Sequence, residues 1–261
     1  MAGRIDVAPC GADGIVRVTI SHPGKLNALS VAMWHGLRQA FDALAGADGS
    51  RERVVIVCGE GGAFAAGGDI GEFPQFRFEE ATLRAFHEEA VAPALQAVLD
   101  CPLPVVAQIE GPCVGGGLEI AACCDLRIAG QGSRFGIPIA KLGFPLAPLE
   151  AQIVAQVLPL PLLAELLLEA RLLEAPEALA RGLVHRVVAD DAVAAEALAS
   201  ARRMAGLSPQ AARINKRTLR QLARGGPTAA ERQAHYAYAD SAEHREGLAA
   251  FLDKRPPRFT P

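Results

Sequence analysis

The feature that most constrains the fold is an alternation of short β-branched runs with stretches of helical periodicity through the first 188 residues. The strand-like runs cover 15–20, 54–58, 105–109, 126–129 and 184–188, each bounded by Gly, Pro or Asp. Between the first two runs, segment 30–44 spaces its apolar side chains as on one face of a helix. Interleaved strands and helices favour an α/β core over an all-helical or all-β one.

The strand pattern ends near residue 189, and only helical patterns follow. Helices are expected over 190–205, 208–223, 228–238 and 241–252. Ser208 before Pro209 fits an N-cap followed by Pro at the first helical position, and Thr228 with Glu231 fits a capping box. We therefore predict two parts, an α/β core over 1–189 and a helical region over 190–261.

Composition excludes several classes of protein. The 261 residues are 51% hydrophobic and 21% charged, which is typical of a globular chain with its own core. Aromatic residues make up only 5% and the net charge is −3, so binding of nucleic acid or of an acidic membrane by bulk charge is not expected. No run resembles a signal peptide or a transmembrane span, and we predict a cytoplasmic protein. The six cysteines are expected to be reduced thiols, and no metal site is expected.

Two glycine-rich segments stand out, one at 59–69 and one at 110–119. Each follows a strand-like run, and glycine at a strand exit lets backbone amides approach a ligand closely. Neither fits a dinucleotide-binding or P-loop pattern, and GxSxG is absent. What remains is a pair of amide-donor loops with the carboxylate of Glu119, which could hold a carbonyl as it becomes an enolate. On spacing alone, the glycines fit a pair of tight turns equally well.

Several sequence blocks, in chain order, resemble one family. They are His-Pro-Gly-Lys-Leu-Asn-Ala-Leu-Ser at 22–30, Phe-Ala-Ala-Gly-Gly-Asp-Ile at 64–70, the glycine segment 111–119 and Cys-Asp-Leu-Arg-Ile-Ala at 124–129. Shorter matches follow at 135–136, 142–143, 180–184 and 245–255. Together they span almost the full chain and resemble the enoyl-CoA hydratase/isomerase (crotonase) family.

The resemblance implies a fold and a partner. The fold is α/β, a crotonase-like superhelix of ββα repeats carrying the acyl-CoA site in 1–189. The helical region 190–261 then mediates trimers, often paired into hexamers. The implied substrate is an acyl-CoA thioester, with no cofactor beyond the coenzyme A of the substrate, no metal, no nucleic acid and no membrane.

The resemblance also implies the site residues. The backbone amides of Gly68 and Gly116 form an oxyanion hole for the thioester carbonyl, and Glu119 is the acid/base. Phe251 and Lys254 match tail positions that reach the coenzyme A of a neighbouring subunit. The predicted coenzyme A-binding residues are Lys25, Leu26, Ala66, Asp69, Ile70, Phe251 and Lys254.

The sequence departs from the family pattern in its carboxylates. Hydratases of this family use two glutamates; the first matches Glu119, but Ile139 stands where the second is expected. A third position that carries Asp in some relatives is Ala147. Glu150 is interpreted as a charged residue in the first turn of a helix. Whether Glu150 or Glu72 replaces the missing carboxylate is left open.

The leading hypothesis is therefore a lyase of the hydratase type that adds water to an enoyl-CoA or eliminates it. The alternatives are decarboxylation, isomerisation or hydrolysis of an acyl-CoA on the same scaffold, or an acyl-CoA-binding protein with weak turnover. Other features have simpler interpretations. The basic residues spaced along 213–224 are expected on a solvated or subunit-facing surface. His87 is expected at the surface, and Cys113 as a small packing residue.

Overall fold

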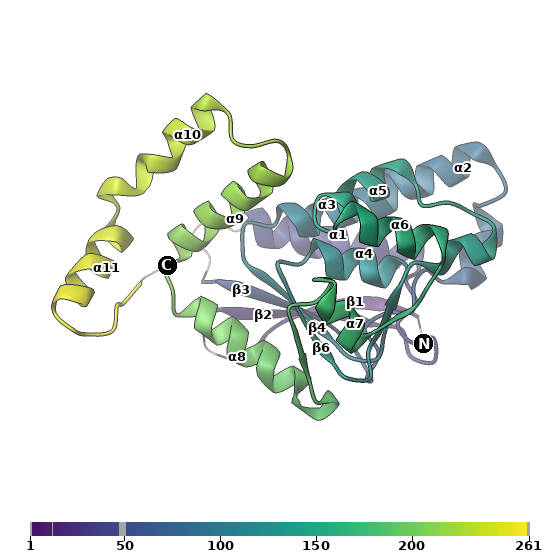
Figure 1. The fold of residues 1–261 in the computed structure, drawn as a ribbon, viewed down its shortest axis with the longest axis horizontal. Coiled ribbons are helices and arrows are strands. Elements are labelled where there is room, and N and C mark those ends of the chain that lie inside the picture. The colour runs from purple at the N-terminus through teal and green to yellow at the C-terminus, as the bar shows by residue number, and fades with distance from the viewer. Residues whose placement is uncertain (1, 12, 47–50, 260–261) are drawn as a thin grey trace.

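The computed structural model describes residues 2–11, 13–46 and 51–259. Its centre is a six-stranded sheet in the order β1-β2-β3-β4-β6-β9 (Figure 1). The strands are β1 (Arg4–Pro9), β2 (Ile15–Ser21), β3 (Val54–Gly59), β4 (Val105–Ile109), β6 (Leu126–Gly130) and β9 (Arg186–Val188). β1 and β2 are antiparallel and every other pair is parallel. The predicted strand-like runs therefore form this sheet, although the last strand begins two residues later than expected.

A second, three-stranded sheet runs in the order β5-β7-β8, with β5 (Pro112–Val114), β7 (Arg134–Gly136) and β8 (Leu173–Glu174). The chain passes from β4 to β5 in this second sheet, then through helix α4 (Gly116–Cys123) to β6 and on to β7. Two strands and a helix thus make this turn of the chain. The strands of the second sheet have only two or three residues each, too few to show a periodicity in the sequence.

Most helices cover one face of the large sheet. They are α1 (Val31–Gly46), α2 (Glu80–Ala85), α3 (Ala92–Asp100), α4, α5 (Pro148–Ala155) and α6 (Leu160–Leu168), while α7 (Ala175–Ala180) lies beside β8 and β9. Short 3₁₀ segments cover Ile70–Gln75, Pro138–Leu142, Asp190–Ala192 and Tyr236–Asp240, and a π-helical turn covers Phe86–Val91. Leu37 and Phe41 of α1 pack with Leu95 and Leu99 of α3 in a continuous buried cluster. The core is thus mainly aliphatic, as the low aromatic content requires.

Helix α8 (Val193–Ala205) packs on the opposite face of the sheet. Its Ala197 and Ala201 lie in a buried cluster with Ile56, Val106 and Ile128 of the strands. Because alanine lets the helix approach the sheet closely, α8 belongs to the core in its packing. The part that projects away consists of α9 (Pro209–Ala223), α10 (Ala229–His235) and α11 (Ala242–Leu252), coloured green to yellow in Figure 1.

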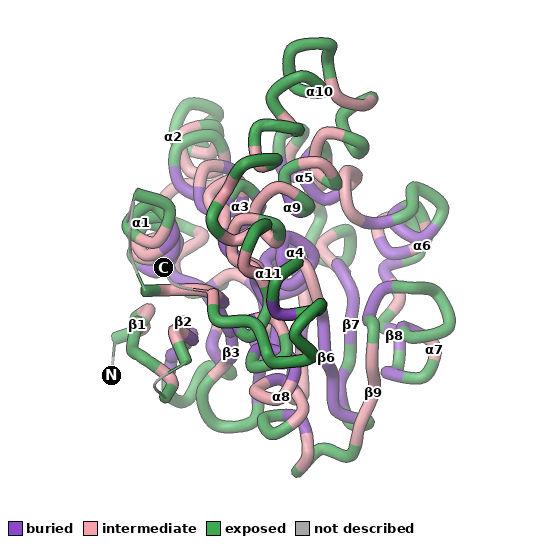
Figure 2. Tube along the Cα trace, turned by 90° about the vertical axis from the view of Figure 1, so that its left-hand side faces the viewer, coloured by how far each residue is buried: buried purple, intermediate pink, exposed green. Residues whose placement is uncertain are grey.

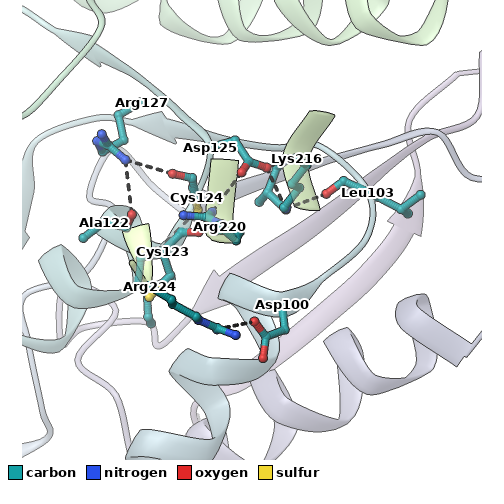
Figure 3. A network of polar contacts seen from close by, with 12 residues as sticks. Asp100, Leu103, Ala122, Cys123, Cys124, Asp125, Arg127, Lys216, Arg220 and Arg224 are labelled. Carbon is teal, nitrogen blue, oxygen red and sulfur yellow. Dashed lines mark hydrogen bonds and ion pairs between the residues drawn. The ribbon is translucent and has the colours of Figure 1, made fainter. Parts of the chain in front are cut away.

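Charged side chains of α9 attach this projecting part to the core (Figure 3). Lys216 Nζ lies 2.7 Å from one carboxylate oxygen of Asp125, and Arg220 lies 2.9 Å from the other. Lys216 also donates to the Leu103 carbonyl at 2.8 Å and is only 7% exposed. The prediction that this basic row faces solvent or a subunit is therefore wrong for Lys216, because Asp125 gives it a buried partner.

The cysteines are all free thiols, and five of the six are buried (Figure 2 shows burial along the chain). Cys10 alone among them is half-buried. Burial raises the pKa of Cys124 to about 12, and it raises the pKa of Cys113 as well. Cys113 is fully buried, in agreement with the interpretation as a packing residue. In the described part of the chain, no helix is long and apolar enough to cross a membrane.

Candidate active site

A pocket lies where the two glycine segments meet the helices, with a volume of about 700 Å³ that includes space open to solvent. Its walls come from α1, α4, α5, the π-helical turn and the 3₁₀ segments near Phe73 and Ile139. Among the predicted site residues, Ala66, Gly68, Ile70, Gly116 and Glu119 line it. The sequence therefore identified both glycine segments and the carboxylate that the fold brings together.

The first glycine segment is held in an extended conformation by Leu29. The Leu29 N–H donates to the Gly67 carbonyl at 2.7 Å, and the Asp69 N–H donates to the Leu29 carbonyl at 2.8 Å. Because successive peptide groups of an extended chain point to opposite sides, the N–H of Gly68 points away from Leu29. Gly67 has a φ of +106°, a conformation that L side chains rarely adopt, so this turn requires glycine.

The second glycine segment places an amide at a helix start. Gly115 has a φ of +53°, and its N–H donates to the Gly136 carbonyl at 2.8 Å. Gly116 is then the first residue of α4, where backbone N–H groups have no acceptor within the helix. The two segments touch, since a Cβ on Gly115 would lie 3.5 Å from Gly67 Cα. A Cβ on Gly116 would lie 2.7 Å from Trp34, so the backbone needs glycine there too.

Glu119 lies on the first turn of α4 and is only 4% exposed. Burial raises its pKa well above the usual value, and the nearby charge of Glu150 raises it further. Its Oε2 atom is buried without a hydrogen-bond partner among the described residues. Seven buried side-chain polar atoms lack a partner there, and three line this pocket: Trp34 Nε1, Arg77 Nε and Glu119 Oε2. Unpaired buried polar atoms are costly, and their concentration here indicates a binding site.

Glu150 lies in the first turn of α5, as interpreted from the sequence, but it is 3% exposed and lines the same pocket. Its Oε1 lies 2.5 Å from Nδ1 of His87 on the π-helical turn. The prediction of a surface position for His87 is therefore wrong, since α5 packs over it. Burial raises the pKa of Glu150 to about 8, although the positive charge of Arg77 lowers it. Burial and the Arg77 charge lower the pKa of His87 to about 4.

These pKa values make the contact between His87 and Glu150 a hydrogen bond between neutral groups at neutral pH, not an ion pair. Arg77 lies beside them, with its guanidinium 3.7 Å from the Phe144 ring centroid and 4.2 Å from that of Phe73. Sequence analysis did not single out Arg77. A lone arginine in a short loop carries no signal of such a position.

The other predicted coenzyme A-binding residues lie outside the pocket lining. Lys25 Nζ lies 2.6 Å from Asp69 Oδ2, so these two residues pair with each other. Leu26 is exposed and has a φ of +47°. Phe251 is 82% exposed at the end of α11, and Lys254 follows with a φ of +54°. Neither Phe251 nor Lys254 is among the residues that line this pocket.

Three residues bear on the missing carboxylate. Ile139 lines the pocket, so an apolar side chain stands where the family pattern expects a glutamate. Ala147 is the N-cap residue of α5 and is half-buried. The Glu72 carboxylate accepts a hydrogen bond from the Val31 N–H at 2.8 Å, at the start of α1. Glu72 therefore caps a helix, and Glu150 is the carboxylate that shares the pocket with Glu119.

A mixed α/β spiral with a helical tail, and a pocket between two glycine segments, define the crotonase fold. A crystal structure of an enoyl-CoA hydratase/carnithine racemase from Magnetospirillum magneticum superposes with a TM-score of 0.93 and 41% identity, covering 98% of this chain and 95% of that one. The enoyl-CoA hydratase from Bacillus anthracis gives a TM-score of 0.87 at 26% identity, covering 98% and 99%.

Sequence comparison agrees with the fold. Residues 11–261 match the model of the enoyl-CoA hydratase/isomerase family. The mitochondrial enoyl-CoA hydratase domain-containing protein 3 of Homo sapiens is 31% identical over 249 residues, covering 94% of this chain and 80% of that protein. The chain belongs to the enoyl-CoA hydratase/isomerase family and is an enzyme of the hydratase-like type.

Proposed function

We propose that this chain adds water to the double bond of an enoyl-CoA thioester and catalyses the reverse elimination. One observation carries the proposal: two glycine amides and the buried, unpaired carboxyl group of Glu119 line one pocket. The thioester oxygen accepts hydrogen bonds from the Gly68 and Gly116 N–H groups. Each such donor is worth about 2.7–4 kcal/mol toward the enolate-like transition state.

In this proposal Glu119 transfers the proton at C2 of the acyl chain. Its raised pKa supports this role, because a higher pKa increases the protonated fraction of the carboxyl group, which is the form that can act as a general acid. The pocket walls at Phe73, Phe86 and Ile139 are apolar and suit an acyl chain. Coenzyme A enters as part of the substrate, on the side of the exposed Leu26 and Ile70.

Hydration of crotonyl-CoA by the purified protein tests the proposal. Glu119→Gln keeps the shape of the side chain but removes the titrating proton, so we expect kcat to fall by about 10²–10⁴. Glu88→Gln, at an exposed carboxylate of the π-helical turn, is the matched control and should keep the wild-type rate. An unchanged rate in Glu119→Gln would overturn the role of Glu119. Thioester binding without hydration, or turnover of malonyl-type thioesters alone, would overturn the proposed reaction.

We infer further that the projecting helices mediate a homotrimer, or a hexamer of two trimers. Large apolar side chains are exposed on α9 and α11, including Leu219, Leu222, Leu248, Phe251 and Leu252. Exposed apolar area of this kind favours subunit contact. In the trimer, Phe251 and Lys254 would reach the coenzyme A bound by a neighbouring subunit. Light scattering on the full chain tests this, and a monomer would overturn it.

A further inference from the structure

The pocket contains a second buried carboxyl group besides Glu119. Glu150 enters from α5, which packs against α4, and both residues are less than 5% exposed. The two act on each other electrostatically, since the charge of Glu150 raises the pKa of Glu119. Two carboxyl groups in one small apolar pocket resist being ionised together.

The surroundings of the two carboxyl groups differ. Arg77 and His87 both lie beside Glu150, and His87 Nδ1 is within hydrogen-bond distance of its Oε1. A positive charge and an N–H donor both favour the ionised form of a carboxyl group. Glu119 instead has an unpaired oxygen, in a fully buried position. When one of the two ionises, the environment therefore favours Glu150.

No other titratable group of the described chain lines this pocket besides Arg77, His87, Glu119 and Glu150. The charged residues on the outer side of Arg77 and His87 belong to a neighbouring surface pocket: Glu80, Arg84 and Glu88. Arg84 is paired with Glu80 there. Burial raises the pKa of Glu150, and the charge of Arg77 and a backbone hydrogen bond at Ala147 lower it.

We propose that Glu150 is the second catalytic residue of the hydration, acting as the base toward water, and that His87 is the residue that positions it. This proposal rests on the proposed function. Glu150, on α5, provides the carboxylate that the family pattern places at position 139, where this chain has Ile139. Two titratable groups whose environments differ are typical of an acid and base pair.

In the proposed reaction, water adds to C3 and a proton then adds to C2. A water molecule gives its proton to the Glu150 carboxylate while its oxygen forms a bond to C3. The π electrons of the C2–C3 double bond form a C1–C2 double bond, and the carbonyl π electrons move onto the thioester oxygen, which the Gly68 and Gly116 amides stabilise. The enolate then takes a proton from the Glu119 carboxyl group at C2. Glu150 has gained one proton and Glu119 has lost one, so a proton transfer between them restores the site.

Glu150→Gln tests the proposal on the full-length protein, with Gln152→Ala at an exposed position of the same helix as the control. We expect kcat for crotonyl-CoA to fall by about 10²–10⁴ in Glu150→Gln. The wild-type rate should rise with pH as Glu150 ionises with a pKa of about 8, and this rise should be absent in the variant. The control should keep both the rate and the pH profile.

A second measurement separates a chemical loss from a folding defect. Exchange of the C2 protons of butyryl-CoA with D₂O needs Glu119 but no attack by water. We expect Glu150→Gln to keep this exchange and Glu119→Gln to lose it. Loss of exchange in both variants would mean that Glu150 is only structural, and would overturn the proposal.

The positioning role of His87 has its own test. His87→Ala should lower kcat with little change in KM and should move the pH profile to higher pH, because the Glu150 carboxylate loses a donor. His87→Asn, whose Nδ2 can donate in place of Nδ1, should restore most of the rate. Wild-type rate and profile in Glu150→Gln would overturn this inference alone. Absence of hydration by the wild-type protein would overturn the proposed function first, and with it this inference.

Discussion

Two walls of the pocket differ in the chemical groups that they present to a ligand. The backbone wall, formed by segments 66–68 and 114–116, offers peptide N–H groups held by hydrogen bonds of the main chain. The carboxylate wall, formed by Arg77, His87, Glu119 and Glu150, offers side chains whose protonation depends on one another. The contribution of the backbone wall to the rate should therefore be sensitive to added volume and insensitive to pH. The contribution of the carboxylate wall should be sensitive to pH and less sensitive to added volume.

Among the variants that compare the two walls, the largest expected effect tests the backbone wall. In Gly116→Ala the new Cβ would lie 2.7 Å from the buried ring of Trp34, so the start of α4 must move. Displacing one amide donor should lower kcat/KM by about 10²–10³. Initial rates of crotonyl-CoA hydration measure this, and the shape of the pH profile should stay as in the wild type. A wild-type rate would show that this amide makes no contact in the transition state.

The next effect tests the carboxylate wall through stability. Glu150 binds its proton up to a pKa of about 8 in the folded chain, against about 4.5 when unfolded. The folded state therefore binds more protons between these values, and the free energy of unfolding falls as pH rises through this range. Glu150→Gln removes this pH-dependent loss of stability. The melting temperature of the variant should therefore exceed that of the wild type by an amount that grows from pH 5 to pH 8. A constant difference across this range would contradict a raised pKa at Glu150.

A smaller effect isolates the charge of Arg77. Arg77→Met keeps the length of the side chain but removes the charge that favours ionised Glu150. The pKa of Glu150 should rise, and the alkaline rise of kcat/KM should move to higher pH by about one unit. Arg84→Met, in an exposed pair with Glu80, is the control. An unmoved profile would mean that Arg77 has no electrostatic effect on the carboxylate wall.

The smallest effect returns to the backbone wall. A Cβ on Gly68 would lie 3.1 Å from the edge of the Phe73 ring, which can shift slightly. Gly68→Ala should therefore cost about 1 kcal/mol at most, or less than about fivefold in kcat/KM. The contrast with Gly116→Ala is the sharper test, because the proposed function gives the two glycines equivalent roles toward the substrate. Equal losses of kcat/KM in Gly68→Ala and Gly116→Ala would show that the steric conflict with Trp34 does not cause the loss in Gly116→Ala.

The backbone wall could be predicted from the sequence, and most of the carboxylate wall could not. Gly68, Gly116 and Glu119 lie in two contiguous segments whose glycines carry a steric signal. Glu150 is visible in the sequence as a charge at a helix start, but its burial depends on how α5 packs over residues some sixty positions earlier. Tertiary contacts of this kind leave no local pattern.

His87 shows a second reason why the carboxylate wall could not be predicted from the sequence. It lies in a π-helical turn, Phe86–Val91, between α2 and α3. A π turn inserts an extra residue into the helical repeat and changes which side chains face the core. A 3.6-residue periodicity read across this segment therefore predicts the wrong face. The fold was easier to predict, because β2, β3, β4 and β6 each carry an apolar run bounded by turn residues.

The distribution of the thiols has a practical consequence. Cys10 is half-buried near the start of the chain, while the other five thiols are enclosed in the core. In the native protein a maleimide dye should therefore react mainly with Cys10, and labelling of the remaining five requires the core to open. The extent of alkylation over time then counts opened molecules directly. Any of the variants above can be compared with the wild type in this way, without substrate and without a spectroscopic probe of folding.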